Sequence, residues 1–485
     1  MPSGSVPFME GLPSICGAEQ RVEEAARRRN PVFLRETNLQ LERLRAVFAI
    51  ALHMHQPLIP AGGGDPRTAD LISNLEFMMR NPGQGDNHNA PVFAECYARM
   101  GEMIRDLVHE GRNPRVMLDF SGELLFGLRK MGRGDVLERI RPLACDPRLR
   151  RYVEWLGTMW GHAVIPSTPP PDFRLHLRAW QHEFAALYGW EALGRVRGFS
   201  PPEMHLPNHP DVSYEYVQAL KECGYRWLLV QEHSAEAADG GGLREKYLPS
   251  RLLVKNSLGE ELSIVAIIKT QGSDTKLVAQ MQPFYEAQTL PRRTLDGFSV
   301  PPLVAQIGDG ENGGVMMNEF PAAYRQAICR LGTEGVTNAN VTEYLELLEG
   351  AGVPERLLPA IRPIQQGLVL NRIRKWEPGA ADAAIQELHR EKPGFNMEGG
   401  SWTNNISWVR GYENVLTPMN RLSADFHRVL DNRRVDTAGR PYRNALYHLL
   451  VSQTSCFRYW GQGLWTDYAR EICRRGAEIL EHDFR

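Results

Sequence analysis

The sequence predicts an α/β protein in which a seven-stranded barrel is followed by a bundle of helices. The first observation is that short runs rich in Val, Ile, Leu and aromatic residues alternate with longer polar or amphipathic stretches. This alternation is typical of parallel strands joined by crossover helices. The second observation is that helical periodicity replaces the strand signals after about residue 320.

Seven apolar runs are the predicted barrel strands. They lie at residues 46–52, 115–120, 152–160, 195–200, 225–231, 263–269 and 303–308. Between them, stretches such as 173–188 and 212–223 carry apolar residues at three- and four-residue spacing, which predicts helices. Near the end of the chain the same spacing is clearest at residues 408–431, 442–460 and 464–482.

Three parts of the chain follow from these signals. Residues 1–44 mix Pro, Gly and charge, including the run Arg27-Arg28-Arg29, and are expected to form an arm over the surface. Residues 45–330 are the expected barrel, and residues 331–485 a helical domain that completes its cleft. No internal repeat or long low-complexity tract interrupts this order.

Composition narrows the class of protein and of partner. The 56 basic and 58 acidic residues are mixed along the chain, so no field of one sign favours nucleic acid or an anionic membrane. The seven cysteines are scattered and form no C-x-x-C pair, so we expect reduced thiols that are mostly buried. No signal-peptide pattern or run of about 18 apolar residues is present, and we therefore expect a soluble, cytoplasmic protein.

Polar residues that directly follow the apolar runs are the candidate functional residues, because active sites of α/β barrels lie at the carboxyl ends of the strands. The first run continues into LHMHQP, which places His53 and His55 on the same side of an extended backbone. The third ends at Trp160 and His162, before a proline run that must leave the sheet as a stiff loop. A single histidine or tryptophan at such a position is equally compatible with packing inside the barrel.

The fourth and seventh runs end near acidic residues. Glu203 stands behind two prolines and is followed by His205, and a rigid backbone there would hold its carboxylate in one direction. Asp309 and Glu311 follow the seventh run among glycines that let the backbone approach a ligand. A lone Glu in a loop is usually a solvated charge, and D-x-E with glycine can form a calcium loop, but the later ligands of an EF-hand are missing.

Two carboxyl groups that face one sugar are the requirement of glycosidic cleavage. Glu203 and Asp309 are predicted at the mouths of two strands of one barrel, so they would face one cavity. In a retaining enzyme one attacks the anomeric carbon while the other protonates the departing oxygen, at a separation of roughly 5–5.5 Å.

The order of these motifs resembles glycoside hydrolase family 57. His55-Gln56-Pro57, Gly161-His162, Pro202-Glu203-Met204 and Asp309-Gly310-Glu311 are similar to its first four regions. Glu-Gly-Gly-Ser-Trp at 398–402, with Trp408 nearby, is similar to the fifth. The resemblance covers roughly residues 46–470.

This resemblance implies a distorted (β/α)7 barrel with a C-terminal α-helical domain and a retaining mechanism on α-glucans. It implies Glu203 as nucleophile and Asp309 as general acid/base, and it implies no metal or other cofactor. The expected substrate-binding residues are His55, Trp160, His162, His205, Glu311, Trp402, Trp408 and Trp460. The aromatic residues around Trp402 and Trp408, and those around Trp460, are equally compatible with packing between helices. Hydrolysis, glucan transfer and branching all stay open, as do the linkage and the oligomeric state.

Two rival hypotheses come from the same residues. His53 and His55 could bind one divalent ion in a metal-dependent hydrolase, with His162, His205, His209 and Asp309 as further ligands. The barrel could also bind glucan without catalysis, having kept its carboxylates but lost a competent cleft.

Overall fold

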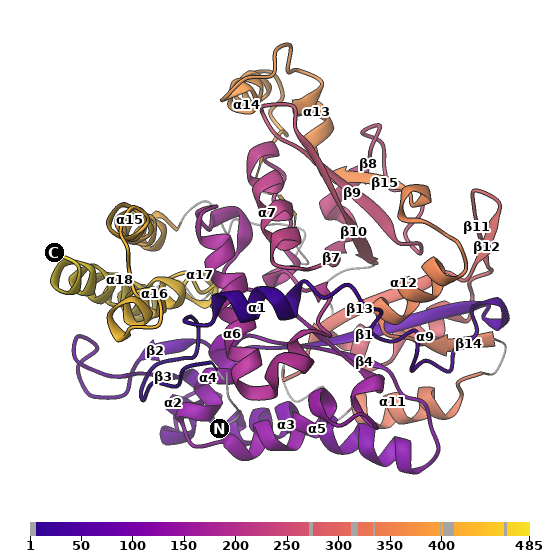
Figure 1. Cartoon of the computed structure of the whole chain (residues 1–485), viewed down its shortest axis with the longest axis horizontal. Coiled ribbons are helices and arrows are strands. Elements are labelled where there is room, and N and C mark those ends of the chain that lie inside the picture. The colour runs from indigo at the N-terminus through magenta and orange to yellow at the C-terminus, as the bar shows by residue number, and fades with distance from the viewer. Residues whose placement is uncertain are drawn as a thin grey trace.

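A computed structural model describes residues 6–270, 275–311, 319–332, 335–397, 399–400, 412–459 and 463–485. Its centre is a set of seven parallel strands, one at each predicted run (Figure 1). These strands are β1 (Ala46–Met54), β4 (Val116–Phe120), β5 (Val153–Leu156), β6 (Gly198–Phe199), β7 (Trp227–Gln231), β10 (Glu261–Lys269) and β13 (Leu303–Asp309).

The seven strands form a ring with two thin joints, which are places where neighbouring strands share a single register pair or a single bridge. Parallel pairing runs from β5 through β4, β1 and β13, and from β10 through β7 to β6. β10 and β13 share a single register pair, Lys269 with Ala305. β5 and β6 meet at one bridge, where the Gly157 N–H donates to Gly198 O at 3.0 Å and Ser200 N–H donates to Gly157 O at 2.8 Å. The prediction of a distorted seven-stranded barrel is confirmed.

Side chains alternate between the inside and the outside of the ring, as the period of a strand requires. On β1, Val47, Ala49 and Ala51 belong to an inner cluster that includes Leu229 of β7 and Ile307 of β13. The intervening residues of β1 belong to a larger outer cluster with the surrounding helices. Because both faces are buried, each strand reads as a continuous apolar run rather than an alternating one.

Helices cover the outside of the ring. Those of the barrel region are α2 (Asn74–Arg80), α3 (Ala90–His109), α4 (Gly122–Lys130), α5 (Gly134–Cys145), α6 (Asp172–Leu193), α7 (Pro210–Glu222), α8 (Thr275–Ala279), α9 (Gln282–Ala287), α11 (Phe320–Cys329) and α12 (Val341–Gly350). Two short hairpins, β2 (Leu58–Pro60) with β3 (Leu71–Ser73) and β11 (Arg293–Leu295) with β12 (Phe298–Val300), lie off the main sheet.

The main sheet receives strands from beyond residue 331, which differs from the expectation of helices alone. β14 (Val336–Asn338) pairs with β1, and β15 (Ala360–Pro363) joins the extension that β9 (Ser250–Lys255) and β8 (Ala235–Ala237) add to β10. These late strands have three and four residues, too few for a pattern to stand out from neighbouring loops. The division at residue 331 therefore cuts through the sheet.

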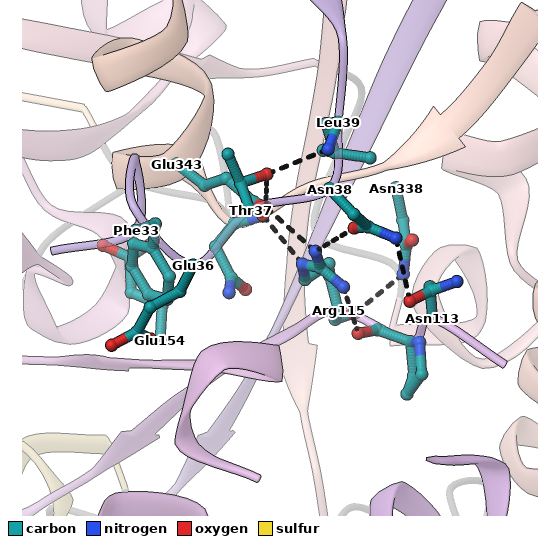
Figure 2. A network of polar contacts seen from close by, with 12 residues as sticks. Phe33, Glu36, Thr37, Asn38, Leu39, Asn113, Arg115, Glu154, Asn338 and Glu343 are labelled. Atoms are coloured by element: carbon teal, nitrogen blue, oxygen red, sulfur yellow. Dashed lines mark hydrogen bonds and ion pairs between the residues drawn. The ribbon is translucent and has the colours of Figure 1, made fainter. Parts of the chain in front are cut away.

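The arm of residues 6–44 runs along the barrel and is tied to α12. Glu346 accepts the backbone N–H groups of Val32, Phe33 and Leu34 at 2.6–2.9 Å. Its neighbour Glu343 forms a buried ion pair with Arg115 at 2.8 Å, and Figure 2 shows the arm residues Thr37 and Asn38 joined to that pair. Helix α1 (Glu19–Ala26) packs on α6.

The C-terminal helices gather at one side of the barrel (Figure 1). They are α15 (Glu413–Leu430), α16 (Arg440–Ser452), α17 (Cys456–Tyr459) and α18 (Leu464–Asp483). A separate small core joins α13 (Gln366–Leu370) and α14 (Ala380–Glu391), which lie at the top of the view in Figure 1, away from α18. The predicted helical C-terminal region is confirmed, and within the described residues no helix is long and apolar enough to cross a membrane.

Candidate active site

The carboxyl end of β1 places a histidine between two aspartates. In the register of the sheet, His53 lies opposite Asp119 on β4 and opposite Asp309 on β13. The His53 Nδ1 atom is 2.8 Å from an Asp119 carboxylate oxygen, and both side chains are buried. The side chain of His53 is therefore held in one orientation by its neighbour on β4.

Three histidine rings stack face to face at this end of the barrel. The ring of His162 lies 4.1 Å from that of His55 and 4.7 Å from that of His53, with interplanar angles of 14° and 27°. The backbone of His162 has φ 49°, in the left-handed region that side chains rarely adopt. This conformation follows the predicted turn after β5 and brings the ring back over the other two.

The three rings carry different charges. Burial lowers the pKa of His53, but the ion pair and hydrogen bond with Asp119, followed by Asp309 and Glu311, outweigh burial and raise that pKa to about 10. Burial and the nearby charge of His53 lower the pKa values of His55 and His162 well below the ordinary range. The stack thus contains one imidazolium and two neutral imidazoles near pH 7.

The backbone at Glu203 is strained. Glu203 has φ 59° and Met204 has φ 52°, directly after Pro201 and Pro202. Of the six non-glycine residues with positive φ in the described chain, these two and His162 lie in this site. Such strain persists only where surrounding structure fixes the conformation, and it concentrates at functional sites.

Glu203 is also more accessible than its surroundings. It is half-buried, while Pro202, Met204 and His205 beside it are buried. Its charge acts on Arg458, whose pKa burial lowers to about 10 against the opposing effect of Glu203. The Glu203 carboxylate therefore lies near a buried cation from the C-terminal helices.

Asp309 ends β13 and Glu311 follows it after one glycine. A Cβ atom at Gly310 would come within 2.1 Å of the end of the Met54 side chain, so a larger residue would require that side chain to move. The Gly310 N–H donates to His53 O at 2.8 Å, and the His55 N–H donates to a Glu311 carboxyl oxygen at 3.1 Å. Burial and then the charge of Asp309 raise the pKa of Glu311 to about 8.

A segment of the C-terminal region completes the site. Ser455 Oγ is 2.7 Å from His162 Nδ1, and the Ser455 N–H donates to His162 O at 3.2 Å. Cys456 Sγ lies 3.4 Å from His55 Nε2. Burial raises the pKa of the Cys456 thiol well above its usual range, with Glu123 and Glu203 adding to the rise. The thiol therefore stays protonated.

Several of these residues were not predicted from the sequence. Asp119 lies near the end of the second apolar run, and Ser121 and Glu123 follow it, where the rule of polar residues at strand ends would have found them. Ser121 Oγ is 2.8 Å from His55 Nδ1, and Glu123 lies 3.9 Å from His55 Nε2. Ser455 and Cys456 carried no signal, because they lie 293 and 401 residues from the histidines that they contact.

The structure corrects one predicted substrate contact and places another deep in the protein. Trp160 is fully buried, packed against Tyr447 and over Gly122, so its indole ring belongs to the core and offers no face to a sugar. His205 is buried directly after Glu203 and Met204. The predicted aromatic residues Trp402, Trp408 and Trp460 lie outside the described residues.

The histidine geometry does not favour a metal centre. Stacked rings direct their nitrogen atoms along parallel planes rather than toward one point, whereas a metal needs converging ligands. His209 instead caps α7 and pairs with Asp382 at 3.1 Å. Within the described ranges, no group of three or more His, Cys, Asp or Glu side chains is arranged to hold a metal ion.

The thiols agree with the sequence prediction. All seven cysteines are free, and five of them are buried, while Cys145 is partly buried and Cys329 is exposed. Cys456 is the one that contacts a histidine of the site.

The fold and the site define an α/β barrel with carboxylates and histidines at the carboxyl ends of its strands. Residues 47–279 match the family model described as Glycosyl hydrolase family 57. This match agrees with the family that the order of the motifs predicted. A search of curated proteins finds no sequence match.

Solved structures support the fold. A 4-alpha-glucanotransferase from Thermococcus litoralis is 18% identical, with 89% of this chain and 57% of that chain covered and a TM-score of 0.50. This chain therefore spans a little over half the length of that enzyme. A GH57-type branching enzyme from Pyrococcus horikoshii is 13% identical, with 90% and 89% covered and a TM-score of 0.48. An exo-type maltose-forming amylase from Pyrococcus sp. ST04 is 13% identical, with 90% and 72% covered and a TM-score of 0.49.

Proposed function

We propose that this protein is a retaining glycoside hydrolase or transglycosylase that acts on α-glucans, with Glu203 as nucleophile and Asp309 as general acid/base. The observation that carries the proposal is that both carboxylates lie close to one stack of three histidines, two from the end of β1 and one from the turn after β5. Asp309 raises the pKa of His53, while Glu203 raises the pKa of Cys456, whose sulfur contacts His55. Two carboxyl groups around one small space are what glycosidic cleavage requires.

The local structure supports a nucleophilic Glu203. A nucleophile gains from a fixed direction, because reactivity falls steeply when the attacking atom wanders. The left-handed backbone and the two preceding prolines restrict Glu203 in this way. Arg458 lies close enough to stabilise the carboxylate form that attacks the anomeric carbon.

The surroundings of Asp309 support its role as the general acid/base. Asp309 is half-buried between a charged His53 and Glu311, whose pKa of about 8 keeps it mostly protonated near pH 7. In the first step Asp309 would protonate the departing glycosidic oxygen while Glu203 forms the covalent glycosyl intermediate. In the second step Asp309 would remove a proton from water or from an acceptor sugar, which attacks the anomeric carbon and releases Glu203.

The substrate class comes from the family and its solved members. The Thermococcus litoralis relative is a 4-alpha-glucanotransferase, and the two Pyrococcus relatives are a branching enzyme and a maltose-forming amylase. All three names describe reactions of α-glucans, so maltooligosaccharides and glycogen are the substrates to test first.

The test is substitution of each carboxylate by its amide. Glu203→Gln and Asp309→Asn should each lower kcat on maltoheptaose by at least about a thousandfold, since each removes a carboxylate that stabilises the transition state. Asp296→Asn is the matched control, because this exposed carboxylate lies in the β11–β12 turn. If both site variants turn over maltoheptaose like the parent while remaining folded, the roles are wrongly assigned.

Stereochemistry and products resolve the reaction further. A retaining mechanism predicts that the first product formed keeps the α configuration, which proton NMR of early time points reads directly. Incubation with maltoheptaose and with a branched glucan, followed by separation by length and linkage, distinguishes shortening, disproportionation and branching. An initial β product would refute the retaining assignment.

A further inference from the structure

A second cavity lies at the opposite end of the barrel from the carboxylates. Its volume is about 1090 Å³, and its wall includes Trp227 at the start of β7 and residues 263–265 in the first half of β10. The arm contributes residues 26–29, and α12 closes another side. Because the barrel strands are parallel, these amino ends are separated from the Glu203 and Asp309 site by the length of the barrel.

Positive charge dominates this cavity. Six arginines and one lysine line it, against four glutamates. Two of these glutamates already have partners: Glu346 accepts three backbone N–H groups of the arm, and Glu222 is ion-paired with Arg174. Arg28 and Arg29 are exposed at its rim, as is Arg226. A neutral glucan gives no reason for such a charge excess.

The strongest indication is a buried arginine with too few acceptors. Arg197 is only 1% exposed, and its Nη1 donates to Val196 O at 3.1 Å. The Nε of Arg197 has no hydrogen-bond partner. Burial, followed by the charge of Arg226, lowers the pKa of Arg197 to about 10. Within the described part of the chain Arg197 forms no ion pair, although the charges of Glu346 and Glu154 act on it, and a buried guanidinium in this state is costly unless an anion satisfies it.

The cavity wall is held in place rather than loosely attached. Figure 2 shows how Arg115 and Glu343 anchor the arm at Thr37 and Asn38. Phe33 packs beneath Arg195, with the guanidinium carbon 5.2 Å from the ring centroid. The basic residues of the arm therefore start from a fixed position, which lowers the entropy cost of binding a ligand between them and the barrel.

We propose that this cavity binds a phosphate-bearing small molecule of the size of a sugar phosphate or a nucleotide. Arginine guanidinium groups match phosphate oxygens with paired hydrogen bonds, and the volume is at the upper end of small-molecule sites, roughly 300–1,000 Å³. The proposal does not depend on the reaction at the other end of the barrel. It gives the Arg27-Arg28-Arg29 run a role as one wall of a binding site.

The test is calorimetric titration of the full chain with inorganic phosphate, glucose 1-phosphate and ADP. We expect at least one probe to bind with a Kd below about 1 mM. Arg28→Gln/Arg29→Gln and, separately, Arg226→Gln should each weaken binding about tenfold or more, since charge-assisted hydrogen bonds are lost. The relative affinities of the three probes show whether phosphate alone, a sugar or a nucleoside completes the ligand.

The matched control is Arg433→Gln/Arg434→Gln, which removes the same charge from an exposed site between α15 and α16. Its affinity for the same probe should equal that of the parent, and circular dichroism should show all variants folded. The proposal is overturned if none of the three probes binds, or if the control loses as much affinity as the variants of the cavity.

Discussion

Asp119→Asn should make the stability of the protein depend differently on pH. The pair of His53 and Asp119 raises the pKa of His53 from its ordinary 6.5 to about 10. Because the folded state raises this pKa, the stabilisation is fully present below about pH 6.5 and is lost as the pH rises toward about 10. Over that whole window the linkage amounts to about 5 kcal/mol, at 1.36 kcal/mol for each pH unit.

In the variant, burial is no longer opposed by the Asp119 charge, so His53 should be neutral at pH 7. The difference in unfolding free energy between parent and variant should then shrink by about 1 kcal/mol between pH 7 and pH 8. Above about pH 8 the change is smaller, because Glu311, whose pKa is about 8 and is lowered by His53, keeps its proton longer in the variant.

Urea denaturation at the two pH values measures this difference. Asp296→Asn is the control: its carboxylate is exposed, its φ of 45° suits asparagine, and its difference from the parent should not change with pH. Asp119→Asn should also lower kcat/KM on maltoheptaose about tenfold or more, as the loss of a charged hydrogen bond predicts. A difference between parent and Asp119→Asn that stays constant from pH 7 to pH 8 would refute the assignment of a charged His53.

Three further predictions follow from contacts within the site and from the ion pair of Arg115 with Glu343 that holds the arm. Ser455→Ala removes the 2.7 Å contact that orients His162. The kcat/KM of this variant should therefore fall about 5- to 30-fold, with little change in Tm, and unaltered kinetics would contradict the role of Ser455. In the parent, kcat/KM should decline as the pH rises through about 8, because ionised Glu311 adds a second negative charge beside Asp309. Glu311→Gln should abolish that decline. A decline that persists in Glu311→Gln would show that another group causes it. Arg115→Met should lower the unfolding free energy by about 3–5 kcal/mol, because it leaves the buried Glu343 carboxylate without its partner. Adding Glu343→Leu should restore part of this loss in denaturation experiments. A double variant no more stable than Arg115→Met would argue against this explanation.

The barrel could be predicted because its signal is local. Most residues of the ring strands are buried on both faces, and so the strands appear in the sequence as short, mainly apolar runs. The polar residues at the ends of those runs then located Glu203, Asp309 and the three stacked histidines. The family motifs gave the same residues; Glu203 and the three histidines lie within the matched residues 47–279, while Asp309 lies beyond them, and the roles of both carboxylates stay predictions.

What could not be predicted depends on contacts between distant segments. Ser455 and Cys456 reach the histidines only because the C-terminal helices pack beside the barrel, and no spacing in the sequence encodes that docking. Trp160 had the composition of a sugar platform, yet its position over Gly122 makes it a core residue. Burial of this kind is decided by tertiary packing, which a run of residues does not reveal.

The two thin joints of the ring divide it into halves that carry one of the proposed catalytic carboxylates each. Asp309 ends β13, in the half with β1, β4 and β5, while Glu203 follows β6, in the half with β7 and β10. Among the residues that the structure describes, the Gly157 bridge and the pair of Lys269 with Ala305 are the contacts that join the backbones of these halves within the ring. The distance between the Glu203 and Asp309 carboxylates therefore depends chiefly on side-chain packing between the two half-barrels. If these residues are the nucleophile and the acid/base, core substitutions where the halves meet should alter the reaction without changing either carboxylate.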